Sequence, residues 1–529
     1  MITAVILARC TSSRLPKKHF YKIGNKRLIN IIIDNLKKNN LISKIYIATG
    51  SKKKNNLFKS VSKKEKVELH FHKNEDDVTG RVHTITKKIS TKYTLLISGD
   101  CCLVDNSFIK RLYKQIEAQD TDFIKSRKKL IHEGIKIFKT NIWKKVNKLS
   151  KKDYQKEHPG YVVKEHPDKF KIGKYEPLKY ELGKKFRLSV DTESDLDFFN
   201  KHFAYLKSKD KEFNLINVIK SKNYTYLNKH VTQKKANVSA KAKYVILTAV
   251  SKKIGLGHFS RSKTLFREIN ETITSKVKII CLGKKFIDKD FFYKDRIKFI
   301  NKISDKLFLE KNKIIIDLPQ NLFNNLSNNK INKKNIVIID NLRNLKKPTF
   351  IIPSARKVKV DKKDNVYSGK DILIVSRKIL NSISCKKITK KNYLLLSGSS
   401  KLSVKIINLL KKEKKIKLIL GRLITSSELK ILKKMKIKYE INKVNYFENL
   451  SNANNVYCKF GLTAYEMILL KKKPIIIEEN ESNEVKKDIK YLFDKGLIKL
   501  IKNNGTISKN KKLNLDINKS LKKIMDIIK

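Results

Sequence analysis

Residues 1–18 read MITAVILARCTSSRLPKK and decide the fold expected for the N-terminal half. The apolar run Ile2–Ala8 is short and continuous, which is typical of a strand buried on both faces of a parallel sheet. Loops at the carboxyl ends of such strands bind ligands in open α/β folds. The loop that follows here carries the cations Arg9, Arg14 and Lys18 and the hydroxyls of Ser12 and Ser13. These groups can hold a polyphosphate through charge-assisted hydrogen bonds, although a solvated basic loop has the same composition.

The size and charge of the chain narrow the function classes. A chain of 529 residues with 40% hydrophobic content predicts two to four packed domains. The net charge of +73 is that of a nucleic-acid binder. However, only 14 of the 122 basic residues are Arg, and Lys is accompanied by abundant Ile and Asn, the composition that an AT-rich genome encodes. Phosphate and base recognition favours Arg, so we expect no nucleic-acid partner and keep a nucleic-acid-associated basic protein as an alternative.

The cysteines and apolar runs indicate a cytoplasmic protein. Six cysteines form no CxxC pair and no zinc-type spacing with His, so we interpret them as reduced thiols. No apolar run approaches 18 residues, and the N-terminal run ends in Arg9 rather than at a small-residue cleavage site. We therefore expect neither membrane insertion nor a signal peptide.

The first half alternates between strand and helix patterns. Strands are expected at 2–8, 44–48, 67–71 and 94–98, with helices at 26–37 and 81–88. This order predicts an α/β fold with a doubly wound, mostly parallel sheet.

Two aspartates follow apolar runs in this half. Asp100 ends the run 94–98 through Gly99, and Asp191 ends the run RLSV at 187–190. Mg²⁺ is commonly bound by one or two carboxylates together with phosphate oxygens, so we predict a metal site at these two residues. A helix N-cap is the alternative for each, above all for Asp191, which precedes a helical pattern.

Five stretches together resemble a known family over about residues 1–228. Residues 8–18 (ARCTSSRLPKK) resemble the signature loop of the cytidylyltransferases that make CMP-activated nonulosonic and deoxy-octulosonic acids, with the spore-coat-polysaccharide type as the nearest branch. Residues 98–105 (SGDCCLVD) and 190–196 (VDTESDL) resemble the two metal-binding segments. Residues 75–81 (EDDVTGR) are similar to a segment near the nucleotide, and 157–167 to the sugar-acid side. The family usually has Gly in place of Thr11 and Lys17, and Pro in place of Cys102.

The resemblance implies nucleotidyl transfer from CTP to a nonulosonic acid, with pyrophosphate as the leaving group. Arg14 and Lys18 would hold the β and γ phosphates, and Mg²⁺ on Asp100 and Asp191 would bridge triphosphate and acceptor. The remaining implied substrate-binding residues are Arg9, Ser12, Ser13, Asp77 and Arg81. The family is often dimeric, which implies a homodimer through the N-terminal domain.

A polar stretch separates this domain from a second α/β pattern. Residues 229–243 (KHVTQKKANVSAKAK) have little apolar periodicity and are interpreted as a linker. A buried-type strand at 244–250 follows, then the loop SKKIGLGHFSR at 251–261 and a helix expected at 259–269. A GxG before a helix fits a dinucleotide site and a plain turn equally well. The lack of a third Gly, and of an acidic residue after the strand at 277–281, disfavours a standard NAD site.

The pattern GxGHxxR, formed by Gly255, Gly257, His258 and Arg261, resembles the entry loop of the UDP-sugar hydrolases of pseudaminic acid synthesis. These are built like a two-lobed (GT-B-like) glycosyltransferase. Further similar stretches lie at 314–317, 336–340, 394–399, 418–421 and 459–466, with Pro474 and 479–480. The resemblance implies an N-terminal lobe at 244–385 and a UDP-binding lobe at 386–529. It also implies UDP contacts at Gly461, Thr463, Glu466 and Asn480, although Phe460 and Leu462 replace a family Gly and Ser.

His258 is the predicted catalytic residue of the second half. A histidine at a helix start can act as a general base toward water, and a structural histidine at a helix cap is the alternative. The whole sequence is thus interpreted as a cytoplasmic bifunctional enzyme of nonulosonic acid synthesis. The front half would use CTP and a nonulosonic acid, and the back half would hydrolyse a UDP-sugar. The alternative for the back half is a glycosyltransferase or a non-catalytic UDP-sugar binder.

Overall fold

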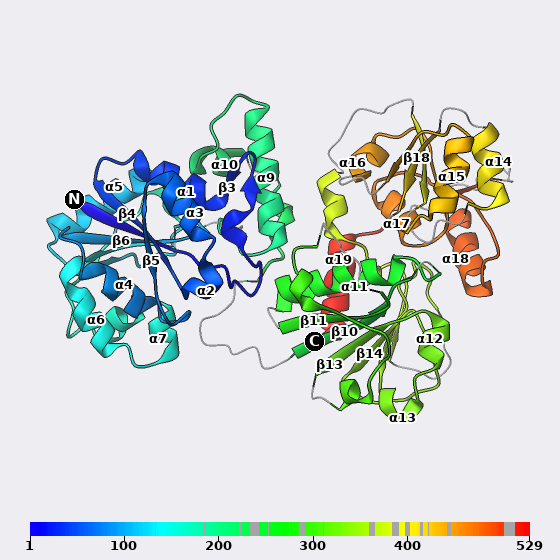
Figure 1. Ribbon diagram of the computed structural model, residues 1–529, viewed down its shortest axis with the longest axis horizontal. Coiled ribbons are helices and arrows are strands. Elements are labelled where there is room, and N and C mark those ends of the chain that lie inside the picture. Colours follow the sequence, from blue (N-terminus) through cyan, green and yellow to red (C-terminus); the bar gives the residue numbers. More distant parts are fainter. Residues whose placement is uncertain are drawn as a thin grey trace. The chain divides into compact units, whose positions relative to one another are not determined.

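The chain divides into two compact units, residues 1–239 and 240–529 (Figure 1). The computed structural model describes residues 1–132, 134–183, 187–221, 224–232, 243–251, 253–273, 276–284, 291–309, 312–358, 365–382, 391–396, 402–412, 416–421, 423–441, 446–501 and 514–529.

The N-terminal unit is built on a seven-stranded sheet with the order β5-β4-β1-β6-β8-β7-β9. The pairs among β5, β4, β1 and β6 are parallel, and β8 runs antiparallel to both β6 and β7. The sheet strands are β1 Ile2–Leu7, β4 Ile42–Thr49, β5 Glu68–Phe71, β6 Tyr93–Ser98, β7 Phe123–Lys125, β8 Ile135–Lys139 and β9 Ile172–Lys174. The hairpin β2 Lys22–Ile23 and β3 Lys26–Arg27 stands apart from it. The sheet is therefore mixed and mostly parallel, as the alternating pattern predicted.

Amphipathic helices cover this sheet. Five apolar side chains of α1 are fully buried, Leu28, Ile29, Ile32, Ile33 and Leu36, and burying each contributes about 1.5–3 kcal/mol. The helix begins at Leu28 rather than at Lys26, because Lys26 and Arg27 pair as β3. The helices are α1 Leu28–Lys37, α2 Lys52–Asn55, α3 Phe58–Glu65, α4 Val78–Thr86, α5 Asn106–Ala118, α6 Trp143–Leu149, α7 Asp153–Glu157, α8 Tyr161–Glu165, α9 Glu193–Lys207 and α10 Leu215–Ser221.

The position of β1 explains why its loop carries the site. Strand β1 lies between β4 and β6, pairing residue by residue with Tyr93–Ser98. The parallel register brings the ends of β1 and β6 together, and Gly99 permits the contact. A Cβ on Gly99 would lie 2.8 Å from the Leu7 carbonyl oxygen and 2.9 Å from the His19 ring, so a larger residue would force the two strand ends apart.

The C-terminal unit contains two separate parallel sheets. The first has the order β12-β11-β10-β13-β14-β15-β16 and the second β19-β18-β17-β20-β21-β22. In each sheet the first strand in sequence lies third in space. The next two strands are added on one side of it and the remaining strands on the other, which is the doubly wound order of dinucleotide-binding folds. The strands of the first sheet are β10 Lys243–Ala249, β11 Lys276–Leu282, β12 Ile297–Ile300, β13 Lys313–Asp317, β14 Ile336–Ile339, β15 Thr349–Ile351 and β16 Val366–Tyr367. Those of the second are β17 Asn392–Leu396, β18 Ile416–Leu420, β19 Tyr439–Ile441, β20 Val456–Cys458, β21 Ile475–Ile476 and β22 Lys499–Leu500.

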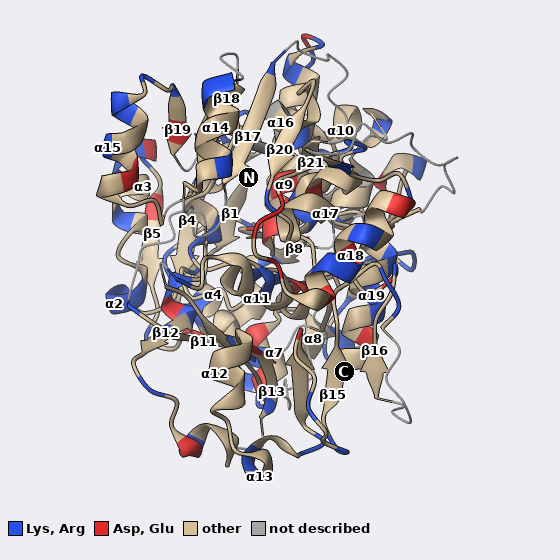
Figure 2. Ribbon diagram, turned by 90° about the vertical axis from the view of Figure 1, so that its right-hand side faces the viewer, with Lys and Arg blue, Asp and Glu red and all other residues tan. Residues whose placement is uncertain are grey.

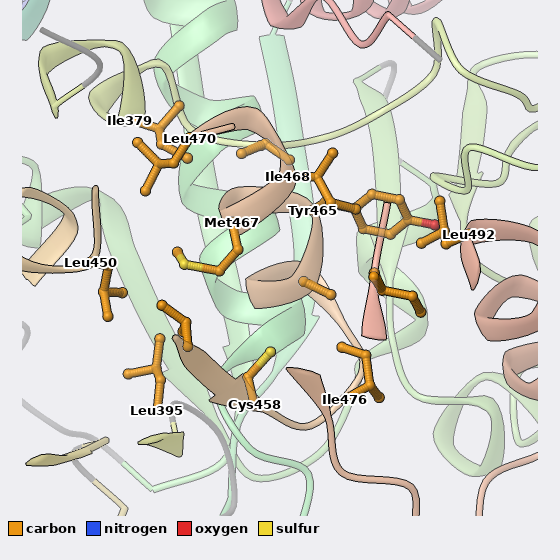
Figure 3. Close-up of a cluster of buried hydrophobic side chains, with 14 of the residues drawn as sticks. Ile379, Leu395, Leu450, Cys458, Tyr465, Met467, Ile468, Leu470, Ile476 and Leu492 are labelled. Atoms are coloured by element: carbon orange, nitrogen blue, oxygen red, sulfur yellow. The ribbon is translucent and has the colours of Figure 1, made fainter. Parts of the chain in front are cut away.

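Each sheet of this unit has its own apolar core. Figure 3 shows the core beside the second sheet, where Met467 and Ile468 of α17 and Leu470 just after it pack near Cys458 of β20 and Ile476 of β21. Ile379, from the segment that connects the two sheets, belongs to the same cluster. The helices are α11 Gly257–Glu268, α12 Gln320–Asn324, α13 Asn328–Ile331, α14 Val404–Lys412, α15 Ser426–Lys434, α16 Tyr446–Ser451, α17 Leu462–Leu469, α18 Asn483–Asp494 and α19 Ile517–Ile528.

The stretch predicted to be a linker starts too early. Residues 229–232 belong to the N-terminal unit: Val231 is buried, and the Thr232 carbonyl oxygen accepts a hydrogen bond from Arg14 at 3.0 Å. Their polar character suits the wall of a polar cavity, which composition alone does not distinguish from a linker. Residues 233–242 lie outside the described residues, as does the predicted lobe boundary at 385/386.

Basic residues occur on elements throughout the described chain. Figure 2 shows Lys and Arg on α2, α15 and α18 alike, which agrees with a compositional origin of the charge. In the part of the chain that is described, every helix is too short or too polar to cross a bilayer.

Candidate functional site

A cavity of about 640 Å³ opens at the carboxyl ends of β1 and β6 in the N-terminal unit. Eight cationic side chains line it, against three carboxylates. The cations are Arg9, Arg14, Lys18, Arg81, Lys129, Lys136, Arg187 and Lys229, and the carboxylates are Asp100, Glu157 and Asp191. Such an excess of positive charge in a concave site attracts and holds polyanions.

Lys18 joins the two aspartates that were predicted to bind metal. Its Nζ atom lies 2.7 Å from Oδ2 of Asp100 and 2.9 Å from Oδ1 of Asp191. Burial alone would lower the pKa of Lys18, but the two carboxylates outweigh this and raise it. Lys18 therefore stays an ammonium ion between two carboxylates that lie 82 and 173 positions further along the chain.

Asp191 is surrounded by cations. Its Oδ2 atom accepts from Arg14 at 2.7 Å and from Arg187 at 2.6 Å, while Oδ1 faces Lys18. Burial would raise the pKa of Asp191, but Lys18, Arg14 and Arg187 hold it well below its usual range. Asp191 precedes α9 without capping it: the cap is Thr192, whose hydroxyl accepts from the backbone of Asp195. The N-cap alternative raised for Asp191 thus falls to its neighbour.

The two aspartates fit a divalent ion. Both present a carboxylate oxygen to one position, the one that the Lys18 ammonium holds here. The second oxygen of Asp100 accepts from the Ser98 hydroxyl at 2.7 Å, which fixes the orientation of the carboxylate. One or two carboxylates beside a phosphate-binding loop is the donor set that Mg²⁺ takes.

Glu75, which does not line the cavity, fixes the basic loop (residues 9–18) through hydrogen bonds. Its carboxylate accepts from the Thr11 hydroxyl at 2.8 Å, from Ser51 N–H at 2.8 Å and from Asn55 Nδ2 at 2.7 Å. Burial would raise the pKa of Glu75, but these hydrogen bonds outweigh it and the pKa is lowered. Asn55 in turn accepts from the backbone N–H of Cys10 at 2.7 Å. The loop conformation therefore depends on residues at the end of β4.

His19 ties the basic loop to the end of β6. Its Nδ1–H donates to the Gly99 carbonyl oxygen at 2.8 Å, and its Nε2 accepts from the Arg9 backbone N–H at 3.3 Å. Only the neutral ring can do both. Burial, followed by the charge of Lys18, lowers the pKa of His19 to about 4, so the ring is neutral at physiological pH.

A family model described as cytidylyltransferase matches residues 3–265. The N-terminal part of this chain belongs to the cytidylyltransferase family. The matched range covers the whole cavity and continues past residue 239 into α11.

Relatives of the cytidylyltransferase unit include proteins from distant organisms. An uncharacterized protein of Methanocaldococcus jannaschii is 28% identical over 242 residues, covering 46% of this chain and 96% of that protein. Spore coat polysaccharide biosynthesis protein SpsF of Bacillus subtilis is 20% identical over 201 residues, covering 37% and 83%. A solved cytidylyltransferase of Leptospira borgpetersenii is 23% identical with a TM-score of 0.39, covering 44% of this chain and 99% of its own. A CMP:2-keto-3-deoxy-manno-octonic acid synthetase solved with CTP is 15% identical with a TM-score of 0.32, covering 39% and 99%.

The remaining predicted residues of the cytidylyltransferase unit separate into two groups. Arg9, Ser12, Ser13 and Arg81 line the cavity, although Arg81 is almost fully buried and donates to the Glu75 carbonyl oxygen at 2.8 Å. Asp77 is not among the lining residues. Its carboxylate caps α4, accepting from Gly80 N–H at 2.8 Å.

One wall of the cytidylyltransferase cavity was not recognised from the sequence. Residues 129–131 run beside 181–183, with Gly183 N–H donating to the Lys129 carbonyl oxygen at 2.8 Å and Ile131 N–H to that of Glu181 at 2.7 Å. The fully buried Glu181 carboxylate anchors this wall through Arg111, 2.9 Å from its Nε. Of the predicted sugar-acid segment 157–167, residues 157–159 line the cavity and 165–167 do not.

The second unit gathers its own charged cluster at the carboxyl ends of β10, β13 and β14. His258 lies in the first turn of α11, which begins at Gly257, two residues earlier than expected. Its Nδ1 lies 2.6 Å from Oδ1 of Asp317, the fully buried last residue of β13. Arg261 also holds Asp317, with Nη2 2.7 Å from Oδ1 and Nε 3.1 Å from Oδ2.

The contacts of this cluster orient the imidazole ring of His258. Burial would raise the pKa of Asp317, but Arg261 and His258 lower it, so the carboxylate is ionised and can only accept. Nδ1 of His258 faces this carboxylate at 2.6 Å and Nη2 of Arg261 at 3.0 Å. In the tautomer that donates from Nδ1 to Asp317, Nε2 is the nitrogen that can accept a proton. Arg261 is fully engaged: Nη1 lies 2.6 Å from Asp340.

The glycines and the late motif take the following places. Gly255 has a φ of 81°, and Gly257 would meet nothing within 4 Å of an added Cβ. Gly461 has a φ of 148° and precedes α17, on which Thr463 and Glu466 are buried. Asn480 is exposed beyond β21. Ser397 to Ser399, part of one predicted match, lie outside the described residues.

Proposed function

We propose that the N-terminal unit transfers CMP from CTP to the anomeric hydroxyl of a nonulosonic-type sugar acid, releasing pyrophosphate. The observation that carries this proposal is the cluster of Arg14 and Lys18 on Asp100 and Asp191, inside a cationic cavity of a cytidylyltransferase-family unit. The excess of cations suits two anionic substrates at once, a triphosphate and a carboxylic acid.

In this proposal the basic loop changes partners when the triphosphate enters. Arg14 and Lys18 turn from the aspartates to the β and γ phosphates, which leaves Asp100 and Asp191 to hold Mg²⁺. The bound ion would neutralise charge on the phosphates and template the acceptor. The sugar hydroxyl attacks the α-phosphorus, the bond to the β-phosphate oxygen breaks, and the hydroxyl proton is released. Arg14 and Lys18 stabilise the charge that develops on pyrophosphate, so catalysis is positioning and electrostatics.

A panel of nucleoside triphosphates and sugar acids tests this proposal. Pyrophosphate release should require CTP, a divalent ion and a nonulosonic or deoxy-octulosonic acid, and Asp100→Asn should abolish it. Release of pyrophosphate with every triphosphate, or full activity of Asp100→Asn, would contradict the proposed site.

We propose a second activity for the C-terminal unit, hydrolysis of a UDP-diacetamido-trideoxy sugar. The specific observation in its favour is the His258–Asp317 pair, in which Nδ1 of the ring lies 2.6 Å from a fully buried carboxylate. Nε2 would take a proton from water as the water oxygen attacks the anomeric carbon and UDP departs. The two sheets of doubly wound order support a two-lobed, GT-B-like module.

The two activities can be separated in the full-length chain. With a UDP-sugar and no acceptor, UDP release should persist in Asp100→Asn and fall about 10²–10⁴-fold in His258→Ala. Binding without release in the wild type would instead favour a UDP-sugar binder, and release only after an acceptor sugar is added would favour a glycosyltransferase.

A further inference from the structure

Among the described residues, three cations contact Asp191, and Arg187 is the one of them that does not come from the basic loop. It precedes α9 by six residues and lines the cavity with 12% of its side chain exposed. In the sequence, Arg187 is simply the first residue of the run RLSV that precedes Asp191. Its contacts indicate a distinct task.

Arg187 is anchored on its far side. Nε lies 3.3 Å from Oδ1 of Asp195, which is fully buried in the first turn of α9. The other oxygen of Asp195 accepts from Thr192 and from the Asp191 backbone N–H, both at 3.0 Å. Nδ2 of Asn228 lies 3.2 Å from both the Arg187 carbonyl oxygen and Oδ1 of Asp195. The guanidinium is therefore fixed by a buried hydrogen-bond network and not by residues of the basic loop.

Toward the cavity, Arg187 contacts only one of the two carboxylate oxygens of Asp191. Nη2 of Arg187 donates to Oδ2 at 2.6 Å and to the Ser189 hydroxyl at 3.0 Å. Oδ1 is left to point at Nζ of Lys18, the position that it shares with Oδ2 of Asp100. When Arg14 and Lys18 move to phosphates, Arg187 at 2.6 Å is the cation that remains on Oδ2, beside a longer contact of 3.4 Å from the Ser189 hydroxyl.

We propose that Arg187 is a positioning residue of the cytidylyltransferase site, which pins Oδ2 of Asp191 so that Oδ1 stays paired with Asp100 around one divalent ion. This inference rests on the proposed function of the N-terminal unit. Groups that orient metal-binding side chains typically account for 10–100-fold in metal affinity. Arg187 acts on the ion through Asp191 and not on the phosphates.

Mn²⁺ binding to the full-length chain tests the inference without turnover. Free Mn²⁺ is measured by electron paramagnetic resonance with CTP present and no sugar acid, so that no product forms. Arg187→Met should raise the Mn²⁺ dissociation constant about 10–100-fold and leave CTP binding in metal-free buffer within about twofold. Arg187→Lys should recover part of the loss, because a lysine can still donate to Oδ2 but cannot hold Asp195 at the same time.

Two comparison variants sharpen the result. Arg14→Met, which removes a proposed phosphate contact, should weaken CTP binding in metal-free buffer. Arg127→Met removes one cation from an exposed position near the end of β7 and should match the wild type in both measurements. Circular dichroism confirms that each variant is folded, and a misfolded Arg187→Met leaves Arg187→Lys to decide by the same Mn²⁺ measurement.

The outcomes separate the inference from the proposed function. Equal Mn²⁺ affinity in wild type and Arg187→Met would overturn the positioning role, as would an Arg187→Met that loses metal-free CTP binding in the manner of Arg14→Met. A wild-type chain that binds neither CTP nor Mn²⁺ would overturn the proposed function itself.

Discussion

The neutral state of His19 predicts a specific acid sensitivity of the N-terminal unit. His19 is 2% exposed, and its pKa is lowered from 6.5 to about 4 by burial and by Lys18. As the pH falls, the unfolded chain takes up a proton near pH 6.5 while the folded unit does not. The free energy of unfolding therefore falls from about pH 6.5 until about pH 4, where the folded ring is protonated too.

The size of the effect follows from the shift. Each pH unit between the two pKa values corresponds to about 1.36 kcal/mol, so the full window is worth on the order of 3 kcal/mol. His19→Gln cannot take up a proton, but its amide can donate to the Gly99 carbonyl oxygen and accept from the Arg9 N–H. At pH 7.5 we expect the variant to be close to the wild type in stability. Between pH 7.5 and pH 5 the free energy of unfolding of the variant should fall by about 2 kcal/mol less than that of the wild type.

Urea unfolding at pH 7.5, 6 and 5 measures this difference. Trp143 is the only tryptophan in the chain and is fully buried in the N-terminal unit, so its fluorescence reports on that unit alone. His166→Gln controls for the loss of a histidine elsewhere in the unit. If the wild type and His19→Gln lose the same free energy of unfolding between pH 7.5 and 5, then His19 is not a neutral ring held by two hydrogen bonds, and the assignment is refuted.

Three further predictions concern the two sites. Glu75→Ala removes the clamp on Thr11 and should raise KM for CTP about tenfold in the pyrophosphate assay, with a smaller effect on kcat; an unchanged KM would contradict the clamp. Lys17 has a φ of 56°, which costs a non-glycine residue about 1–2 kcal/mol. Glycine also has greater conformational entropy in the unfolded chain, which offsets part of this gain. Lys17→Gly should thus raise the free energy of unfolding by up to about 1 kcal/mol. A lower free energy of unfolding, measured by Trp143 fluorescence in urea, would count against this. Asp317→Asn should slow UDP release about as much as His258→Ala, because the amide nitrogen can donate to Nδ1 and so move the ring proton to Nε2; near-normal release would exclude the pair.

The local pattern of the N-terminal unit could be predicted because it depends on near neighbours in the sequence. The buried strand Ile2–Leu7 follows from a short continuous apolar run, and the amphipathic face of α1 follows from the period of 3.6 residues. Both appear in the structure within a few residues of the expected bounds. The parallel character of the sheet follows from the alternation of such segments. The errors lie at boundaries, as at Lys26 and Arg27, where pairing with a neighbouring strand outweighs helix propensity.

The polar supports of the site could not be predicted from the same information. His19 and Glu75 act through groups that lie far away in the sequence, Gly99 for His19 and Thr11 for Glu75. The partners of Arg187 on Asp191 and Asp195 are near in the sequence, but no helical or strand periodicity brings them together. A histidine, a glutamate or an arginine in a polar stretch is equally consistent with a solvated surface. Asp77, by contrast, was expected near substrate and caps a helix, because a carboxylate before a helix serves either purpose.

What the sequence determined by itself was the set of elements and the chemistry of the loop after β1, since both are written in residues next to one another. The tertiary structure alone decided that Lys18 meets Asp100 and Asp191, and that Arg187 holds the second of them from behind. Those meetings arise from the parallel alignment of strand ends and from the buried anchor at the start of α9, and both are products of packing between segments that lie up to 173 positions apart.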